Sequence, residues 1–284
     1  MDVILICILI LVILLIVLFL AWVLLLRTNG TGRKAAFAPF EACYIAHRGF
    51  FNNEGPAPEN SMAAFRAAIR AGYGIETDVQ STKDGKLILF HDDDLKRMCG
   101  IDKLVEECTY EELQQYYLAN SLETAPLFSD FLKTVDGKVP LIIEIKGNGD
   151  WLNTTKKAAR MLDDYKGIYC VESFHPMVVA WMRKNRPQVI RGQLSTNYFT
   201  DEPQAGFFKK FILTNLLLNF KTRPDFIAFN HPWKNLLSYR LCRRLYHPEN
   251  VAWTVKSQKE LEAAKDVYDV FIFDSFVPAP MDAE

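Results

Sequence analysis

Two short stretches of this chain place a histidine beside charged residues at the end of an apolar run. In IAHRGFFNNEGPAPENS, residues 45–61, His47 and Arg48 end the run, and Glu59 follows in the same polar loop. His91 ends a second apolar run. Imidazole titrates near working pH, so two histidines that flank a reacting group can act as general base and general acid. The arginine beside the first histidine is suited to bidentate binding of a phosphate.

Acidic residues occur on two apolar segments that have the composition of core strands. Glu76 and Asp78 lie two residues apart in GIETDVQ, so they share one face of that strand. Glu144 and Lys146 have the same spacing in LIIEIKG. A buried carboxylate is costly unless it is paired or bound to a metal, and these acids therefore predict an oxygen-ligand site for one divalent cation, Mg²⁺ or Ca²⁺. The alternative is an ion-pair network in which Arg48 and Lys146 neutralise the acids.

The combination of histidines, acids and basic residues favours phosphoryl transfer. The sequence has no serine or cysteine nucleophile signature, and no histidine–cysteine cluster has the spacing of a zinc site. A divalent cation, helped by arginine and lysine, can stabilise the charge of a phosphate under transfer. The formal charge of −1, from 33 basic and 34 acidic residues, gives no reason to expect a nucleic acid partner.

Strand-like runs, most of them separated by helical patterns, must position these residues. Strand–helix alternation is typical of a parallel α/β architecture. An open doubly wound sheet is one such fold, but no glycine-rich phosphate loop follows the first run. The nine runs are Cys43–His47, Gly74–Gln80, Leu87–His91, Leu141–Lys146, Tyr169–Phe174, Val189–Leu194, Phe226–Phe229, Val251–Val255 and Val270–Asp274.

The second and third runs are joined by STKDG, which is too short for a crossover between parallel strands. We therefore predict an antiparallel hairpin here, which leaves eight parallel strands, the number in a (β/α)8 TIM-type barrel. A two-residue turn at Asp84-Gly85 would place Asp78 opposite His91, with Cβ atoms about 5 Å apart. Glu76 would share that face, so two acids and a histidine are expected to converge.

The first 34 residues differ in composition from the rest. Val3–Leu26 contains no charged residue, and as a helix it would span about 36 Å, enough to cross a hydrocarbon core of roughly 30 Å. The segment starts after Asp2 and has no small-residue cleavage site before Arg27, which favours a retained anchor over a signal peptide. We expect a transmembrane anchor with a short tether at 1–34 and one barrel domain at 35–284.

Two features favour the cytoplasmic side of the membrane for the domain. Arg27, Arg33 and Lys34 follow the apolar segment, and flanking positive residues prefer the cytoplasm. Apart from Cys7, the five cysteines form an odd set without disulfide or metal spacing. A single-pass membrane protein with a cytoplasmic domain is expected.

One apolar segment, FFKKFILTNLLLNF at 207–220, has two interpretations. The first is a helix of the barrel. The second is a helix that lies on the surface of the bilayer, because apolar side chains beside a lysine pair are typical of interfacial helices.

Taken in order, these motifs resemble the glycerophosphodiester phosphodiesterase family. HRG with PENS downstream, then ETDV, TKDGKLILFHD, EIK, SF and a late WTV follow the family's order between about Ile45 and Val255. The resemblance implies a barrel related to the phosphatidylinositol-specific phospholipases C. It also implies hydrolysis of glycerophosphodiesters, either deacylated phospholipids or lysophospholipids, to a glycerol phosphate and an alcohol with the help of a divalent cation.

Two alternative functions stay open, namely cleavage to a cyclic phosphate, as in the phospholipases C, and an inactive membrane-tethered binding protein.

The resemblance further implies roles for individual residues. The implied roles are acid/base catalysis by His47 and His91, phosphate or substrate binding by Arg48, Lys146 and Trp253, metal ligation by Glu76, Asp78 and Glu144, and a metal-binding or site-lining role for Glu59.

Overall fold

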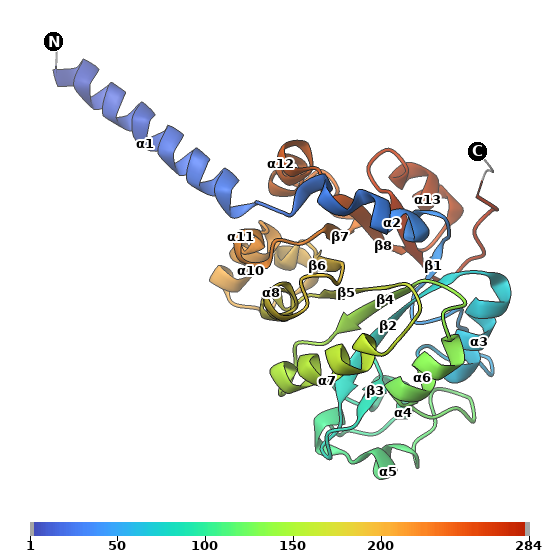
Figure 1. Ribbon diagram of the computed structural model, residues 1–284. Helices are drawn as coiled ribbons and strands as arrows, with labels where there is room; N and C mark the ends of the chain where they lie inside the picture. Colours follow the sequence, from blue (N-terminus) through green and yellow to red (C-terminus); the bar gives the residue numbers. More distant parts are fainter. Residues whose placement is uncertain (1–2, 282–284) are drawn as a thin grey trace.

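The computed structural model describes residues 3–281, and its centre is a closed barrel of eight parallel strands (Figure 1). The first strand pairs with both the second and the last, which closes the ring. The predicted TIM-type barrel is thus confirmed, and the open doubly wound sheet is excluded. The barrel strands are β1 (Ile45–Ala46), β2 (Gly74–Ser81), β4 (Leu141–Ile145), β5 (Tyr169–Ser173), β6 (Arg191–Ser195), β7 (Phe226–Asn230), β8 (Glu249–Val255) and β9 (Val270–Phe273).

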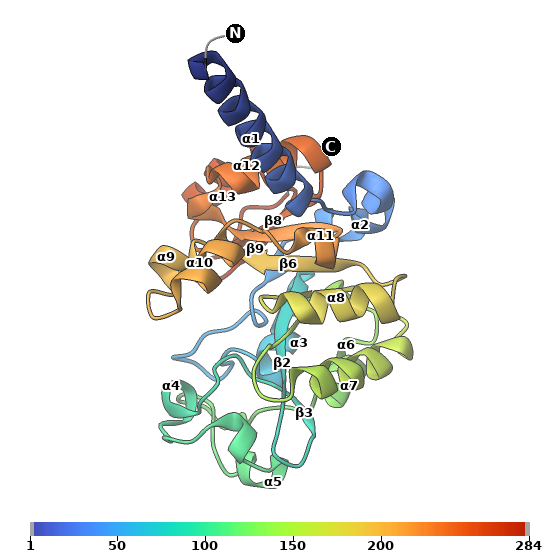
Figure 2. The ribbon, with the colours of Figure 1, turned by 90° about the vertical axis from the view of Figure 1, so that its left-hand side faces the viewer.

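Helices connect the strands and cover the outside of the barrel (Figures 1 and 2). The helix after β1 begins at a cap where the Ser61 hydroxyl accepts a hydrogen bond from the Ala64 amide, and ends at Gly72. The longer helices are α3 (Met62–Ala71), α6 (Phe128–Val135), α7 (Trp151–Asp163), α8 (Pro176–Asn185), α10 (Phe207–Thr214), α12 (Leu237–Tyr246) and α13 (Gln258–Ala264). The short ones are α4 (Lys96–Cys99), α5 (Tyr110–Leu113), α9 (Tyr198–Asp201), α11 (Asn219–Thr222), η1 (Gly30–Arg33), η2 (Val105–Glu107) and η3 (His231–Trp233).

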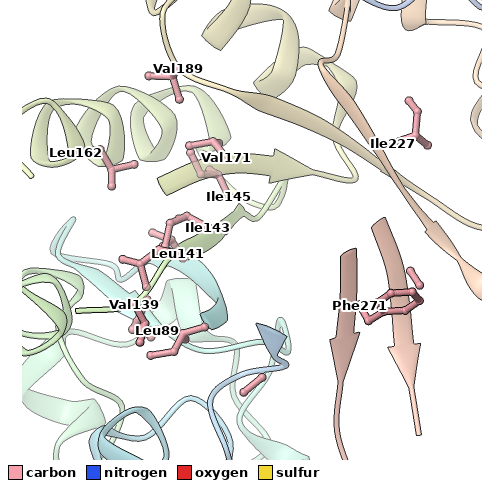
Figure 3. Close-up of a cluster of buried hydrophobic side chains, with 14 of the residues drawn as sticks. Leu89, Val139, Leu141, Ile143, Ile145, Leu162, Val171, Val189, Ile227 and Phe271 are labelled. Atoms are coloured by element: carbon pink, nitrogen blue, oxygen red, sulfur yellow. The ribbon is translucent and has the colours of Figure 1, made fainter. Parts of the chain in front are cut away.

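Apolar side chains alternate along the strands and fill two layers. The outer layer packs Ile143 and Val171 of the strands against Leu162 of α7 (Figure 3). The inner layer fills the barrel itself and is closed at the amino end by α2 (Lys34–Glu41). There the ring of Phe37 lies 5.2 Å from that of Phe226 at the start of β7. The apolar plug at this end leaves the carboxyl ends of the strands for polar side chains.

The hairpin after the second strand exists, but its predicted register is wrong by one residue. β3 (Leu87–Leu89) is antiparallel to β2, with Val79 opposite Leu89. The Phe90 amide donates to the Asp78 carbonyl over 3.0 Å, so Asp78 faces Phe90 rather than His91. The cause is a three-residue loop closed by Gly85 at φ +74°, in place of the expected two-residue turn.

The apolar amino-terminal segment forms α1 (Val3–Leu25), which projects away from the barrel (Figure 1). Within the described residues it is the one helix long and apolar enough to cross a membrane, a criterion that a signal sequence also meets. Its carboxyl end is fixed to the barrel. Leu26 is fully buried, the Tyr246 hydroxyl donates to the Val23 carbonyl over 2.8 Å, and Asn29 donates to Asp225 over 2.5 Å.

Candidate active site

The HRG motif turns the chain sharply at the end of β1. The His47 amide continues the sheet by donating to the Phe273 carbonyl, and the next two residues, Arg48 and Gly49, have left-handed φ angles of 55° and 83°. A Cβ on Gly49 would lie 3.0 Å from both the carbonyl carbon and the Cβ of Ala64, so the position requires glycine. The turn aims the Arg48 amide at Glu76 Oε2, 3.1 Å away.

His47 is held by a carboxylate from the last strand. Its Nδ1 lies 2.8 Å from Asp274 Oδ2, and because a carboxylate accepts, Nδ1 carries the proton and Nε2 keeps its lone pair. Nε2 lies 3.9 Å from Glu76 Oε2. Burial and the charge of Arg48 lower the pKa of His47, although Asp274 opposes them. The imidazole is therefore neutral at neutral pH and can accept a proton at Nε2.

His91 reaches the site from the loop after β3 and is held in a similar way. Its Nδ1 lies 2.6 Å from Asp92 Oδ1, which leaves Nε2 for a ligand. Asp92 is fixed in turn by Arg97, whose Nε donates to Oδ2 over 2.6 Å. The hydrogen bonds from His91 and Arg97 outweigh burial and lower the pKa of Asp92.

Glu76, Asp78 and Glu144 form a buried cluster of acids. Each offers a carboxylate oxygen, and these oxygens lie within 4.8 Å of one another. The cluster follows from the sheet, since Asp78 of β2 and Glu144 of β4 are partners in parallel register. Burial, followed by repulsion from Asp78, Glu172 and Glu144, raises the pKa of Glu76 well above its ordinary value. Such a group of oxygens can hold a metal ion.

The two basic residues of the site also contact these acids. Lys146 Nζ lies 3.1 Å from Glu144 Oε1 and 3.2 Å from Asp78 Oδ1. Arg48 Nε lies 3.6 Å from Asp78 Oδ2, while its NH1 donates to Glu59 over 2.6 Å. The ion pairs predicted from the sequence as the alternative to a metal site are thus present. They leave the cluster short of positive charge, because Arg48 is shared with Glu59.

Glu59 lies outside the acidic cluster and is surrounded by donors. Besides Arg48, it accepts two hydrogen bonds from Arg97, of 2.7 and 2.8 Å, and one of 3.0 Å from Asn53. Burial would raise the pKa of Glu59, but the hydrogen bonds from Arg97 and the charge of Arg48 lower it to about 2. Its geometry is that of an anion that positions Arg48.

These side chains surround one cavity at the carboxyl ends of the strands, with a volume of about 440 Å³. Trp253 and Phe174, whose rings meet edge to face at 5.3 Å, stand between it and an adjoining groove of about 860 Å³ that Lys146 lines. Asp78 is buried and does not line the cavity. The residues singled out in the sequence that line the cavity are His47, Arg48, Glu59, Glu76, His91, Glu144 and Trp253.

Comparison with known proteins agrees with this geometry. The model of the glycerophosphoryl diester phosphodiesterase family matches residues 47–233. The chain belongs to this family. A glycerophosphodiester phosphodiesterase of Bacillus altitudinis is 33% identical over 157 residues, which cover 51% of this chain and 63% of that protein. The alignment therefore spans less than two thirds of that relative.

Two further proteins extend the comparison. A human lysophospholipase D is 32% identical over 107 residues, covering 37% of this chain and 32% of that protein. In the solved structures, an Oleispira antarctica phosphodiesterase in complex with the product sn-glycerol-3-phosphate superposes with a TM-score of 0.67 at 20% identity, covering 84% of this chain and 95% of that chain. This similarity shows that the two chains share a fold.

The site contains residues that the sequence analysis did not single out. Glu172 of β5 is the partner of Glu144 in the sheet, and it lines the cavity with 1% of its surface exposed. Among the described residues, its Oε2 has no hydrogen-bond partner. Burial and repulsion from Glu144 and Asp78 raise the pKa of Glu172 well above its ordinary value. The sequence did contain a signal for this residue, because Glu172 lies in an apolar strand-like run, as Glu76 and Glu144 do.

Asp274, Asp92 and Arg97 were also missed as partners of the site. Asp274 ends the last strand-like run and Asp92 follows His91 directly, so both positions were visible in the sequence. Arg97 lies on α4 and had no motif to mark it. It links Asp92 to Glu59 and so joins the supports of His91 and Arg48 in one network.

Proposed function

We propose that this chain is a membrane-anchored phosphodiesterase that hydrolyses glycerophosphodiesters, either deacylated phospholipids or lysophospholipids, to a glycerol phosphate and an alcohol. One observation carries the proposal. Two histidines, each backed by a carboxylate, line a cavity together with an arginine and two of the three clustered acids that could hold a metal. Residues 1–34 are its anchor and tether, and 35–284 its catalytic domain, on the cytoplasmic side.

The chemistry of the acidic group supports dependence on one divalent cation. All its donors are oxygens, the ligands of Mg²⁺ and Ca²⁺. Counting Glu172, four buried acids face Lys146 and a shared Arg48, so a divalent cation would restore the balance of charge. Held by Glu76, Asp78 and Glu144, the cation would polarise the phosphoryl oxygens and offset the charge that develops on them.

The protein's own side chains supply the remaining steps. Arg48 and Lys146 bind the phosphate, and Trp253 forms a wall of the pocket. His47, neutral and oriented by Asp274, takes a proton at Nε2 from the attacking water as its oxygen bonds to phosphorus. The phosphorus–oxygen bond to the alcohol breaks, and His91, oriented by Asp92, gives that oxygen a proton.

The substrate class rests on three observations. The alignment with a human lysophospholipase D covers part of the chain, and α1 is long enough to keep the site near a bilayer. The apolar side of the larger groove, with Met177, Ile212 and Leu213, suits a substrate that carries an acyl chain.

A panel of substrates and cations tests the proposed function with the full chain in detergent micelles. Glycerophosphocholine and lysophosphatidylcholine should be hydrolysed with Mg²⁺, Ca²⁺ or Mn²⁺, and EDTA should abolish the activity until a cation is added back. Full activity in EDTA would contradict the metal requirement. A cyclic phosphate as end product in ³¹P NMR would favour the phospholipase C-like alternative, and tight binding without turnover would favour a binding protein.

Replacing Glu172 by glutamine should weaken cation binding by about 10–100-fold, the usual effect of losing a group that supports a metal site. The reason is that the substitution removes one of four buried carboxyl groups whose ionised form a bound cation would stabilise, and preserves the shape. Calorimetric titration with Mn²⁺ measures the effect. The control is Glu249→Gln, because Glu249 is also a buried glutamate but lies at the start of β8, away from the cavity. Equal affinities in wild type and Glu172→Gln would show that Glu172 does not contribute.

A further inference from the structure

A cluster of exposed aromatic side chains lies on α9 and α10. Phe207 and Phe208 are 63% and 79% exposed, and Phe199 and Phe211 are exposed as well. The rings contact one another. The centroid of the Phe207 ring lies 5.8 Å from the ring centroids of Phe199 and Phe208, and 6.3 Å from that of Phe211. Contiguous exposed aromatic surface of this kind marks a binding face.

Basic residues accompany the aromatic cluster. Lys210 Nζ lies 5.6 Å from the centre of the Phe199 ring, and Lys209 is exposed beside it. Phenylalanines with lysines on one short helix are the composition of a segment at the boundary between acyl chains and anionic headgroups. Protein–protein interfaces are instead depleted in lysine.

The cluster lies on the side of the barrel from which α1 leaves. Both views place α11 and α12 beside the carboxyl end of α1, and α10 directly precedes α11 in the chain (Figures 1 and 2). That end is fixed there, since Asn219 of α11 and Cys242 of α12 both contact the Leu26 carbonyl. A bilayer crossed by α1 would therefore meet this side of the domain. Exposed residues with the same mixed character continue over α11 and α12, namely Phe220, Lys221, Leu237, Arg240, Arg244 and Leu245.

The opposite face of α10 belongs to the site. Ile212 and Leu213 line the groove of about 860 Å³, together with Leu218, and the same groove extends to His91 and Lys146. One short helix therefore separates the groove of the candidate active site from the exposed aromatic cluster.

We propose that α10 is a second membrane contact, in which Phe207, Phe208 and Phe211 enter the headgroup boundary of an anionic bilayer and bring the groove to the lipid surface. A lipid substrate then enters the groove beside α10 with its acyl chain along Ile212 and Leu213, and its phosphate reaches Arg48. This inference rests on the proposed anchor and phosphodiesterase activity, and it adds the route by which a membrane-resident substrate arrives.

Photo-crosslinking tests the contact directly in the full chain, reconstituted into nanodiscs of phosphatidylcholine and phosphatidylserine. Benzoylphenylalanine at position 208 should crosslink to lipid, whereas the same group at position 122 should not. Leu122 is 85% exposed and lies between α5 and α6, two helices that both views place far from α1 (Figures 1 and 2). No lipid adduct at 208, or adducts to a second protein chain, would overturn the proposal.

A kinetic comparison separates this proposal from the proposed function. The double substitution Phe207→Ser with Phe208→Ser should lower kcat/KM for lysophosphatidylcholine embedded in nanodiscs by about tenfold, the effect of about one partly buried phenylalanine. Hydrolysis of soluble glycerophosphocholine should be unchanged, because neither ring lines the cavity or groove. Leu122→Ser should change neither. Equal losses on both substrates, or no loss, would refute the lipid-contact role, whereas a wild type inactive on both substrates would refute the activity itself.

Discussion

Replacing His47 by asparagine is expected to lower kcat for glycerophosphodiester hydrolysis by about 10²–10⁴-fold, the range that a positioned general base contributes. The asparagine amide can still donate to Asp274, as Nδ1 of His47 does. It has no counterpart of Nε2, so the site keeps its packing but loses the proton acceptor. Affinity for Mn²⁺, measured by calorimetry, should remain within about twofold because the three clustered acids are untouched.

His91→Asn should produce a loss of similar size by removing the proton donor instead. The choice of substrate distinguishes the two roles. With glycerophospho-p-nitrophenol the leaving group needs no proton, so His91→Asn should recover most of the lost rate while His47→Asn should not. Because both groups serve one reaction, the double variant should lose less than the product of the two single losses.

The matched control is His247→Asn. His247 lies at the carboxyl end of α12 at φ +46°, a backbone conformation that asparagine tolerates well, and it is absent from the cavity lining. Its substitution should leave kcat unchanged. If His47→Asn and His247→Asn were equally active, the acid/base assignment would fail.

The barrel could be predicted because its signals are local. Each strand carries its own apolar run, and each helix has its own periodicity and cap, as at Ser61 and Gly72. The shared face of Glu76 and Asp78 in β2 could also be predicted from the alternation of side chains along a single strand. These features depend on residues close in sequence, which is why eight parallel strands and the main acidic cluster could be inferred without coordinates.

The hairpin register and the supports of the site could not be inferred in the same way. TKDGK is compatible with a loop of two or three residues, and one residue of difference changes the partner of Asp78 from His91 to Phe90. Arg97 reaches Glu59 across 38 positions of sequence, a contact that only the folded chain creates. Glu172 is explained by the pairing of β5 with β4, which sequence order suggests but does not fix in register.

The second large effect concerns Glu76, where activity and stability should change in opposite directions. Glu76→Gln should lower cation affinity by at least about 100-fold, more than the loss of a supporting group costs, and activity should fall with it. The same substitution should stabilise the cation-free protein at neutral pH. Burial and the nearby acids Asp78, Glu172 and Glu144 disfavour the charge of Glu76, and glutamine keeps an oxygen for the Arg48 amide.

The sign of the pH dependence follows from the raised pKa of Glu76. Below its ordinary value of 4.5, the group is protonated in both the folded and unfolded states, and wild type incurs no penalty from this charge. As pH rises through the raised pKa, the folded protein loses stability that the glutamine variant keeps. One pKa unit corresponds to about 1.4 kcal/mol. Each kcal/mol moves Tm by about 2–4 °C in a domain of this size. In EDTA at pH 8, Glu76→Gln should therefore melt several degrees above wild type, with no gain near pH 4.

Asp78→Asn provides the matched contrast, because the same kind of substitution meets a different environment. Burial would raise the pKa of Asp78, but Lys146, His91 and Arg48, with a hydrogen bond from Asn60, lower it well below its ordinary value. Its charge stabilises the fold, so Asp78→Asn should melt below wild type in EDTA. Both variants should lose the rise in Tm that Mg²⁺ or Ca²⁺ gives wild type. If Glu76→Gln kept that rise, the acids would be an ion-pair network rather than a metal site. Two results are therefore expected together: opposite Tm shifts of Glu76→Gln and Asp78→Asn in EDTA, and loss of the cation-dependent rise in Tm in both variants. The first result requires the repulsion around Glu76, and the second requires a cation that both residues bind.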